Sequence, residues 1–129
     1  MSQAALNLEQ LCFLSPPPGL EPSTDFTLAQ IADTPGLFSL TVLHGTARLF
    51  VLDPSVYVPS YTPRLPAAEL AAIGTDRDAA LVLVVVNPGA VSTVNLSAPI
   101  VVNPATGACA QVILDGTEWP LRHPLSPAQ

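Results

Sequence analysis

The stretch VSTVNLSAPIVVNP, residues 91–104, and the stretch ACAQVIL, residues 108–114, contain three short apolar segments with turn-forming residues between them. Val, Ile and Thr favour β-strands, and the segments are short enough to be strands of a small sheet. Pro99 has no backbone N–H to donate, so it belongs at a strand start or a sheet edge. Asn95 and Asn103 are placed to bond backbone groups at the two bends. The stretch therefore predicts three strands with joints at Pro99 and Asn103.

The rest of the chain has the same pattern of short, turn-bounded apolar segments. Fifteen prolines and seven glycines are spread along 129 residues, so no segment beyond about ten residues can form an unbroken helix. Residues 37–43 alternate apolar and polar as a half-buried strand does, and residues 79–86 are apolar on both faces, as a central strand is. The pattern predicts an all-β protein of about eight short strands, at residues 10–14, 25–31, 37–43, 47–52, 79–86, 91–96, 100–102 and 109–114.

A single short helix is expected over residues 66–73. Pro66 suits the first helical position, Leu70 and Ile73 share one face, and Gly74 is a typical stop. Such a helix would close one end of a barrel or cover a sheet edge. The length of 129 residues fits one domain over residues 1–129, with residues 1–9 and 126–129 expected to be flexible tails.

The charge composition narrows the possible partners. Ten acidic residues face four arginines and no lysine, which gives a net charge of −6. Nucleic acids and anionic membranes are bound mainly through Lys and Arg, so neither is an expected partner. The N-terminus lacks the basic and apolar regions of a signal peptide, and the longest apolar run is far below the about 20 residues that span a bilayer. A cytoplasmic location is expected.

The sequence contains no recognisable catalytic or metal-binding pattern. Cys12 and Cys109 lack CxxC or histidine-linked spacing, and we interpret both as buried free thiols. His44 and His123 have no neighbouring metal ligands, and we interpret both as solvent-exposed loop residues. No serine lies in a GxSxG motif and no glycines form a phosphate-binding loop. We therefore expect no catalytic residue, no metal and no cofactor.

The chain contains five distinctive blocks of sequence, which are, in order, FVLDP at 50–54 followed by Tyr61, TVNL at 93–96, APIVVN at 98–103, QVIL at 111–114 and RHPL at 122–125. These blocks, in this order, resemble the FliW family of flagellar assembly factors. The resemblance covers roughly residues 11–125 and is strongest after Val91.

The resemblance implies a fold and a function. The fold would be a small antiparallel β-barrel-like structure. The protein would bind flagellin in the cytoplasm and, when released from it, bind and antagonise the translational repressor CsrA, relieving repression of flagellin translation. This partner switching involves no catalysis, no direct contact with nucleic acid and no membrane, and a monomer is expected.

The expected protein-binding residues come from residue type and from the family blocks. Arg122 and Trp119 are of the types that dominate interfaces, although we interpret Trp119 as a core residue at the barrel end. For the two asparagines a purely turn-forming role is at least as well supported as a contact. The expected set is Asn95, Pro99, Asn103, Arg122, His123 and Leu125.

Two other functions stay open from the sequence. One is a small β-barrel hydrolase or ligand-binding protein that uses His44 or His123. The other is a purely structural interaction module. A deep pocket that joins a histidine to an acidic residue would favour the hydrolase.

Overall fold

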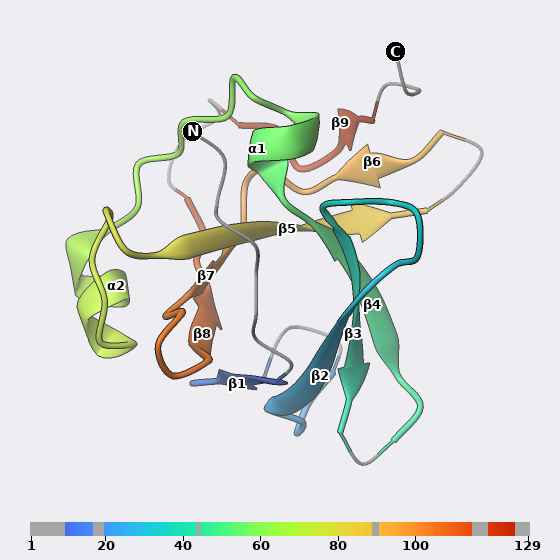
Figure 1. Cartoon of the computed structure of the whole chain (residues 1–129). Coiled ribbons are helices and arrows are strands. Elements are labelled where there is room, and N and C mark those ends of the chain that lie inside the picture. The colour runs from blue at the N-terminus through green and yellow to red at the C-terminus, as the bar shows by residue number, and fades with distance from the viewer. Residues whose placement is uncertain (1–9, 17–19, 44, 89–90, 115–118, 126–129) are drawn as a thin grey trace.

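The computed structural model describes residues 10–16, 20–43, 45–88, 91–114 and 119–125, so the expected tails and His44 lie outside the described residues. Nine strands and two short helices are assigned along this part of the chain (Figure 1). They are β1 Gln10–Phe13, β2 Asp25–Gln30, β3 Leu37–Val42, β4 Arg48–Leu52, α1 Pro54–Tyr57, α2 Ala67–Ala72, β5 Leu81–Asn87, β6 Thr93–Val94, β7 Ile100–Val102, β8 Ala108–Gln111 and β9 His123–Pro124.

Seven of these strands close into a barrel, which confirms the expected fold class. The order runs β4-β3-β2-β1-β8-β7-β5, and β5 pairs back onto β4. All these pairings are antiparallel except the one between β1 and β8, where Cys12 lies opposite Ala108 and Phe13 opposite Cys109. The two short strands β6 and β9 extend the sheet from the end of β5, beyond the closed circuit.

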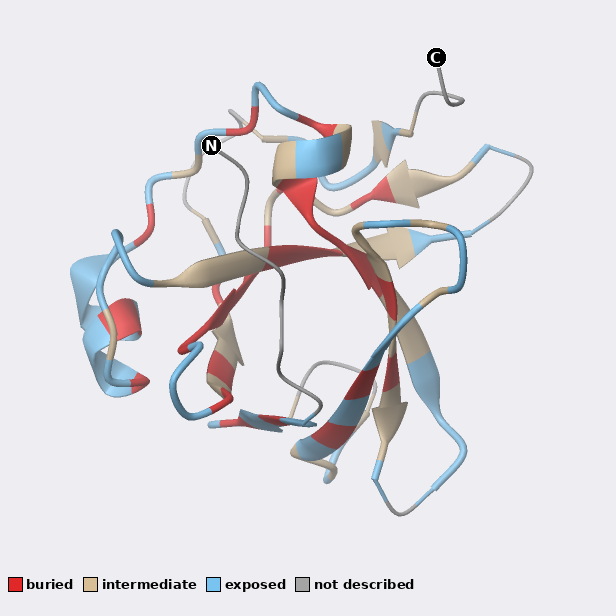
Figure 2. Cartoon of the chain, viewed as in Figure 1, coloured by how far each residue is buried: buried red, intermediate tan, exposed pale blue. Residues whose placement is uncertain are grey.

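The barrel interior is filled by alternate residues of its strands. In β3, Phe38 and Leu40 are buried while their neighbours in the strand are partly exposed, as the sequence alternation predicted. In β2 the same alternation appears as bands of buried and exposed residues (Figure 2). The buried members of this interior cluster are Leu11, Phe13, Phe26, Leu28, Phe38, Leu40, Val51, Leu83, Ile100, Val102 and Cys109.

A second apolar cluster covers the outer face of β4 and β5. Leu52 and Val84 pack there against Val58, Tyr61, Val94 and Leu96. Leu83 faces the barrel interior and Val84 faces this outer cluster, so β5 is apolar on both faces. Its pairing with β4, β6 and β7 confirms the prediction of a central strand.

Helix α2 covers the outer face of β7 and β8 through a third cluster. Leu70 and Ile73 pack against Leu65, Val101 and Val112. The helix ends as predicted at Gly74, whose φ is +80°. The N–H of Gly74 bonds the Ala71 carbonyl and the N–H of Thr75 bonds the Leu70 carbonyl, the paired bonds of a Schellman C-cap. Pro66, expected at the first helical position, is instead the N-cap with extended backbone, and the helix begins at Ala67.

Three further expectations about local structure are wrong. Helix α1 was not expected; Asp53 caps it by accepting from the Ser55 N–H at 2.9 Å, and Pro54 starts it. His123 was expected to lie in a loop, yet β9 forms because residues 123 and 124 pair with β6. Cys12 is exposed rather than buried, because β1 turns it to the outer face while Cys109 points inward.

In the part of the chain that the structure describes, no helix is both long and apolar enough to cross a membrane.

Tyr61 links the second cluster to the segment that follows β6. Its hydroxyl donates to the Leu96 carbonyl at 2.6 Å, and its ring packs edge to face on Trp119 with ring centres 4.7 Å apart. The Leu96 N–H bonds the Pro120 carbonyl at 3.1 Å, so three separate segments meet at this point. Trp119 packs against the second cluster, in agreement with its interpretation as a core residue.

Tyr61→Phe is expected to lower the free energy of unfolding by about 1–2 kcal/mol, because it leaves the Leu96 carbonyl without its buried donor. Burial raises the pKa of the Tyr61 hydroxyl, so the folded state keeps a proton that the unfolded state loses near pH ~10. The stabilisation is therefore complete below about pH 10 and declines above it. Urea denaturation of both proteins from pH 7 to 11 should show the difference narrowing at high pH; a constant difference would contradict this assignment.

Candidate functional site

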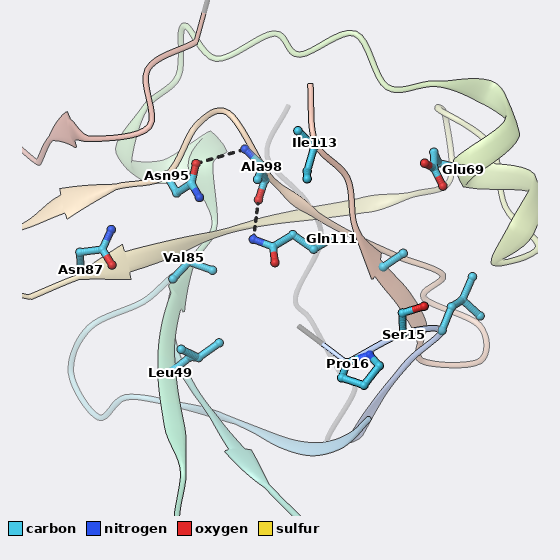
Figure 3. A pocket seen from close by; sticks show the side chains of 12 residues that line it. Ser15, Pro16, Leu49, Glu69, Val85, Asn87, Asn95, Ala98, Gln111 and Ile113 are labelled. Carbon is cyan, nitrogen blue, oxygen red and sulfur yellow. Dashed lines mark hydrogen bonds between the residues drawn. The ribbon is translucent and has the colours of Figure 1, made fainter. Parts of the chain in front are cut away.

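A hollow of about 600 Å³ opens at one end of the barrel (Figure 3). Its inner wall includes Leu49 of β4 and Val85 of β5, whose side chains also pack against the barrel interior. Its rim is formed where the chain leaves β1 at Leu14 and leaves β8 at Ile113. The Leu14 N–H still bonds the Cys109 carbonyl at 3.0 Å, and both segments then continue along the rim. We call this cavity the barrel-mouth hollow.

Side-chain amides form one side of the barrel-mouth hollow. The Asn95 Oδ1 accepts from the N–H and hydroxyl of Ser97 and from the N–H of Ala98, at 2.9 to 3.2 Å. The Gln111 Nε2 donates to the Ala98 carbonyl at 3.1 Å, so the bend after β6 is fixed from both sides (Figure 3). These bonds confirm that Asn95 satisfies backbone groups at its bend, and none of its hydrogen bonds to other described residues uses Nδ2.

A second hollow of about 480 Å³ adjoins the first. It lies between the end of β5 and the segment before β9, and its lining includes Val91, Leu121 and Arg122. Asn87 and Asn95 line both hollows, so the two cavities lie next to each other. We call the second cavity the edge hollow and the combined surface the groove.

Exposed apolar side chains are concentrated in the groove. Six large hydrophobic residues are exposed among the described residues, and four of them line it: Leu14 at 53%, Val91 at 68%, Ile113 at 77% and Leu121 at 58%. Isolated exposed hydrophobic residues are ordinary, whereas a contiguous set commonly marks a binding surface. Among the described lining residues, the charged ones are Glu69 in the barrel-mouth hollow and Arg122 in the edge hollow.

The groove contains two of the six predicted site residues. Asn95 lies at the junction of the two hollows, and the exposed Arg122 lies in the edge hollow. Both can therefore be reached by a partner.

The other four predicted residues lie elsewhere. Pro99 is buried at the start of β7, as its missing N–H predicted, and its carbonyl accepts from Val112. Asn103 is buried and bonds the end of α2. His123 is half-buried in β9 rather than exposed in a loop, and Leu125 packs on the second cluster. Whether these residues contact a partner stays a prediction.

The four exposed apolar residues of the groove and Gln111 were not predicted as site residues. Apolar residues are expected to be buried, and Leu14 and Ile113 lie in apolar segments that the sequence predicts as core. Only the three-dimensional divergence of the chain after β1 and β8 exposes them.

Neither hollow of the groove pairs a histidine with an acidic residue among its described lining residues. No group of three or more His, Cys, Asp or Glu side chains could hold a metal ion within the described ranges. Glu69 is the acidic residue of the barrel-mouth hollow, and neither hollow of the groove includes a described histidine. Burial raises the pKa of the Cys109 thiol, which disfavours the nucleophilic thiolate. An apolar groove edged with amides is instead suited to non-covalent binding of a peptide segment.

Fold and groove together define a class of small closed β-barrel proteins with a peptide-sized apolar groove at the barrel mouth. The sequence model described as "FliW protein" matches residues 3–125. The chain therefore belongs to the FliW family.

Individual relatives agree with this assignment. The flagellar assembly factor FliW of Syntrophotalea carbinolica is 36% identical over 111 residues, which cover 83% of this chain and 79% of the relative. The protein of the same name from Anoxybacillus flavithermus is 33% identical over 114 residues, covering 85% and 79% respectively. A crystal structure of the flagellar assembly factor FliW superposes with a TM-score of 0.82 at 28% identity, over 92% of this chain and 86% of that one.

Proposed function

We propose that this protein is a cytoplasmic flagellar assembly factor that binds flagellin and the translational repressor CsrA by turns. While flagellin occupies the protein, CsrA is free to repress flagellin translation. Once flagellin is exported, the protein binds CsrA and relieves the repression. Family membership supports this partner-switching function.

The observation that carries the proposal is the groove. Its exposed apolar residues suit a protein segment, and a charge of −6 on a chain with four arginines and no lysine supports antagonism of CsrA without RNA contact.

Calorimetry with the full chain tests the binding part of this proposal. We expect it to bind purified flagellin and purified CsrA from its own host, each in the absence of the other. Titrating flagellin into the preformed complex with CsrA should displace CsrA. A well-folded sample that binds neither protein would reject the proposal, and a stable ternary complex would reject partner switching.

A gel-shift assay tests antagonism. Adding the protein to a complex of CsrA with flagellin leader RNA should release the RNA. The matched control contains the protein and RNA alone, where no shift is expected because the protein has few cationic residues.

A further inference from the structure

We propose that the groove binds an apolar segment of flagellin, with side chains of that segment filling both hollows and an acidic group of it pairing with Arg122. The identity of the partner rests on the proposed function. The surface, the polarity of the bound segment and the residues that recognise it go beyond that function.

The apolar contact comes from Leu14 and Ile113 at the barrel-mouth hollow and from Val91 and Leu121 at the edge hollow. Binding removes such surface from water, which contributes roughly 25 cal/mol for each Å² covered. The two hollows share the walls at Asn87 and Asn95, so one continuous segment can enter both.

Charge at the two ends of the groove gives the segment a direction. Of the residues that the structure describes, Glu69 is the charged residue of the barrel-mouth hollow and Arg122 that of the edge hollow. A complementary segment has an acidic group at the Arg122 end and a neutral or basic residue at the Glu69 end. Arg122 can hold a carboxylate through two parallel N–H bonds, which fixes both position and orientation.

Amides at the middle of the groove can recognise the backbone of the segment. The side-chain hydrogen bonds of Asn95 within the described chain all use Oδ1, so Nδ2 can donate to a peptide carbonyl. The Gln111 Nε2 is bonded to Ala98, and its Oε1 can accept from a peptide N–H. Both side chains are already held in place by these bonds, which reduces the entropy lost on binding.

Flagellin fits this lining better than CsrA does. Subunits that assemble into a filament bury apolar surface against one another, and that surface needs cover before assembly. An RNA-binding protein offers a basic surface, for which a lining whose described residues include one acidic residue and one arginine gives little complementarity. Occupation by CsrA or by a second copy of this chain is an outcome that the experiments below distinguish.

Serine substitutions of exposed apolar residues test the contact surface. Ile113→Ser and Leu121→Ser should each weaken flagellin binding about tenfold or more in calorimetry, as central interface residues do. Val56→Ser is the matched control, because Val56 is 50% exposed on α1 and lines neither hollow. It should change the affinity less than about twofold. Circular dichroism checks that all three variants are folded.

Charge reversal tests the orientation. Arg122→Glu should weaken flagellin binding about tenfold or more and reduce its dependence on salt, since a carboxylate would face a carboxylate. Arg64→Glu makes the same change in net charge at an exposed arginine that lines neither hollow, and it should leave the affinity within about twofold.

The outcomes separate this inference from the proposed function. If wild-type protein binds flagellin and the groove variants bind equally well, the inference is wrong and the function stands. If the groove variants no longer bind CsrA but still bind flagellin, the groove is the CsrA-binding site and the inference is also wrong. A wild-type dimer in sedimentation that Ile113→Ser dissociates, without a change in flagellin affinity, would assign the groove to a second copy.

Discussion

Ile100→Ala is expected to lower the free energy of unfolding by about 2–5 kcal/mol, the range for truncating a fully buried aliphatic residue. Ile100 has no exposed surface and lies in the barrel interior with Leu83, its partner across the β5–β7 pairing. Removing its outer carbons leaves a cavity inside a closed barrel, where strands held on both edges cannot move in to fill it. Urea denaturation followed by circular dichroism measures the loss.

Ile113→Ala is the matched control, because it makes the same chemical change at an exposed position. Ile113 lies two residues past the end of β8 and is 77% exposed. Its stability should stay within about 0.5 kcal/mol of wild type. In a binding assay the order of the two effects should be reversed. Folded Ile100→Ala should bind flagellin as wild type does, whereas Ile113→Ala should bind it more weakly. Equal destabilisation by the two changes would contradict the described burial.

Asn103→Ala is expected to cost about 2–3 kcal/mol of stability, because one buried amide serves three backbone groups. Its Nδ2 donates to the carbonyls of Ile73 at 2.8 Å and Gly74 at 3.2 Å, and its Oδ1 accepts from the Ala105 N–H at 2.9 Å. The side chain thereby joins the end of α2 to the turn between β7 and β8. Alanine leaves these partners without their bonds inside the protein.

Asn87→Ala provides the comparison for Asn103→Ala, since Asn87 is exposed at the end of β5. A change of less than about 0.5 kcal/mol is expected there. At a temperature where Asn103→Ala is fully folded, its affinity for flagellin should equal that of wild type. A lower affinity in the folded variant would make Asn103 a contact residue after all.

Strand positions could be predicted from the sequence where local chemistry determines them. Residues 37–42 alternate because one face of β3 meets the barrel core, and residues 100–102 form a strand directly after Pro99. Gly74 ends α2 because the left-handed conformation at C′ costs glycine little. In each case the deciding residues are neighbours in the chain.

Features that depend on distant segments could not be predicted. β9 exists because β6 offers it an edge, and the parallel pairing of β1 with β8 depends on how the barrel closes. Residues 109–113 keep a period of two, with Ala110 and Val112 on the α2 side and Cys109 and Ile113 on the other face. Cys109 is buried in the barrel interior, whereas Ile113 lies at the barrel mouth and is exposed. The alternation rule therefore assigns Ile113 to the core, and the groove that it lines could not be predicted from the sequence.

The parallel pairing of β1 with β8 has a consequence for the order of events during synthesis. β1 is near the start of the described chain and β8 near its end, so this seam cannot form until residues 108–111 have left the ribosome. Leu14 and Ile113, which follow the two strands of the seam, then come together at the barrel mouth. A chain that has not yet extended through residue 113 therefore cannot form the barrel-mouth hollow.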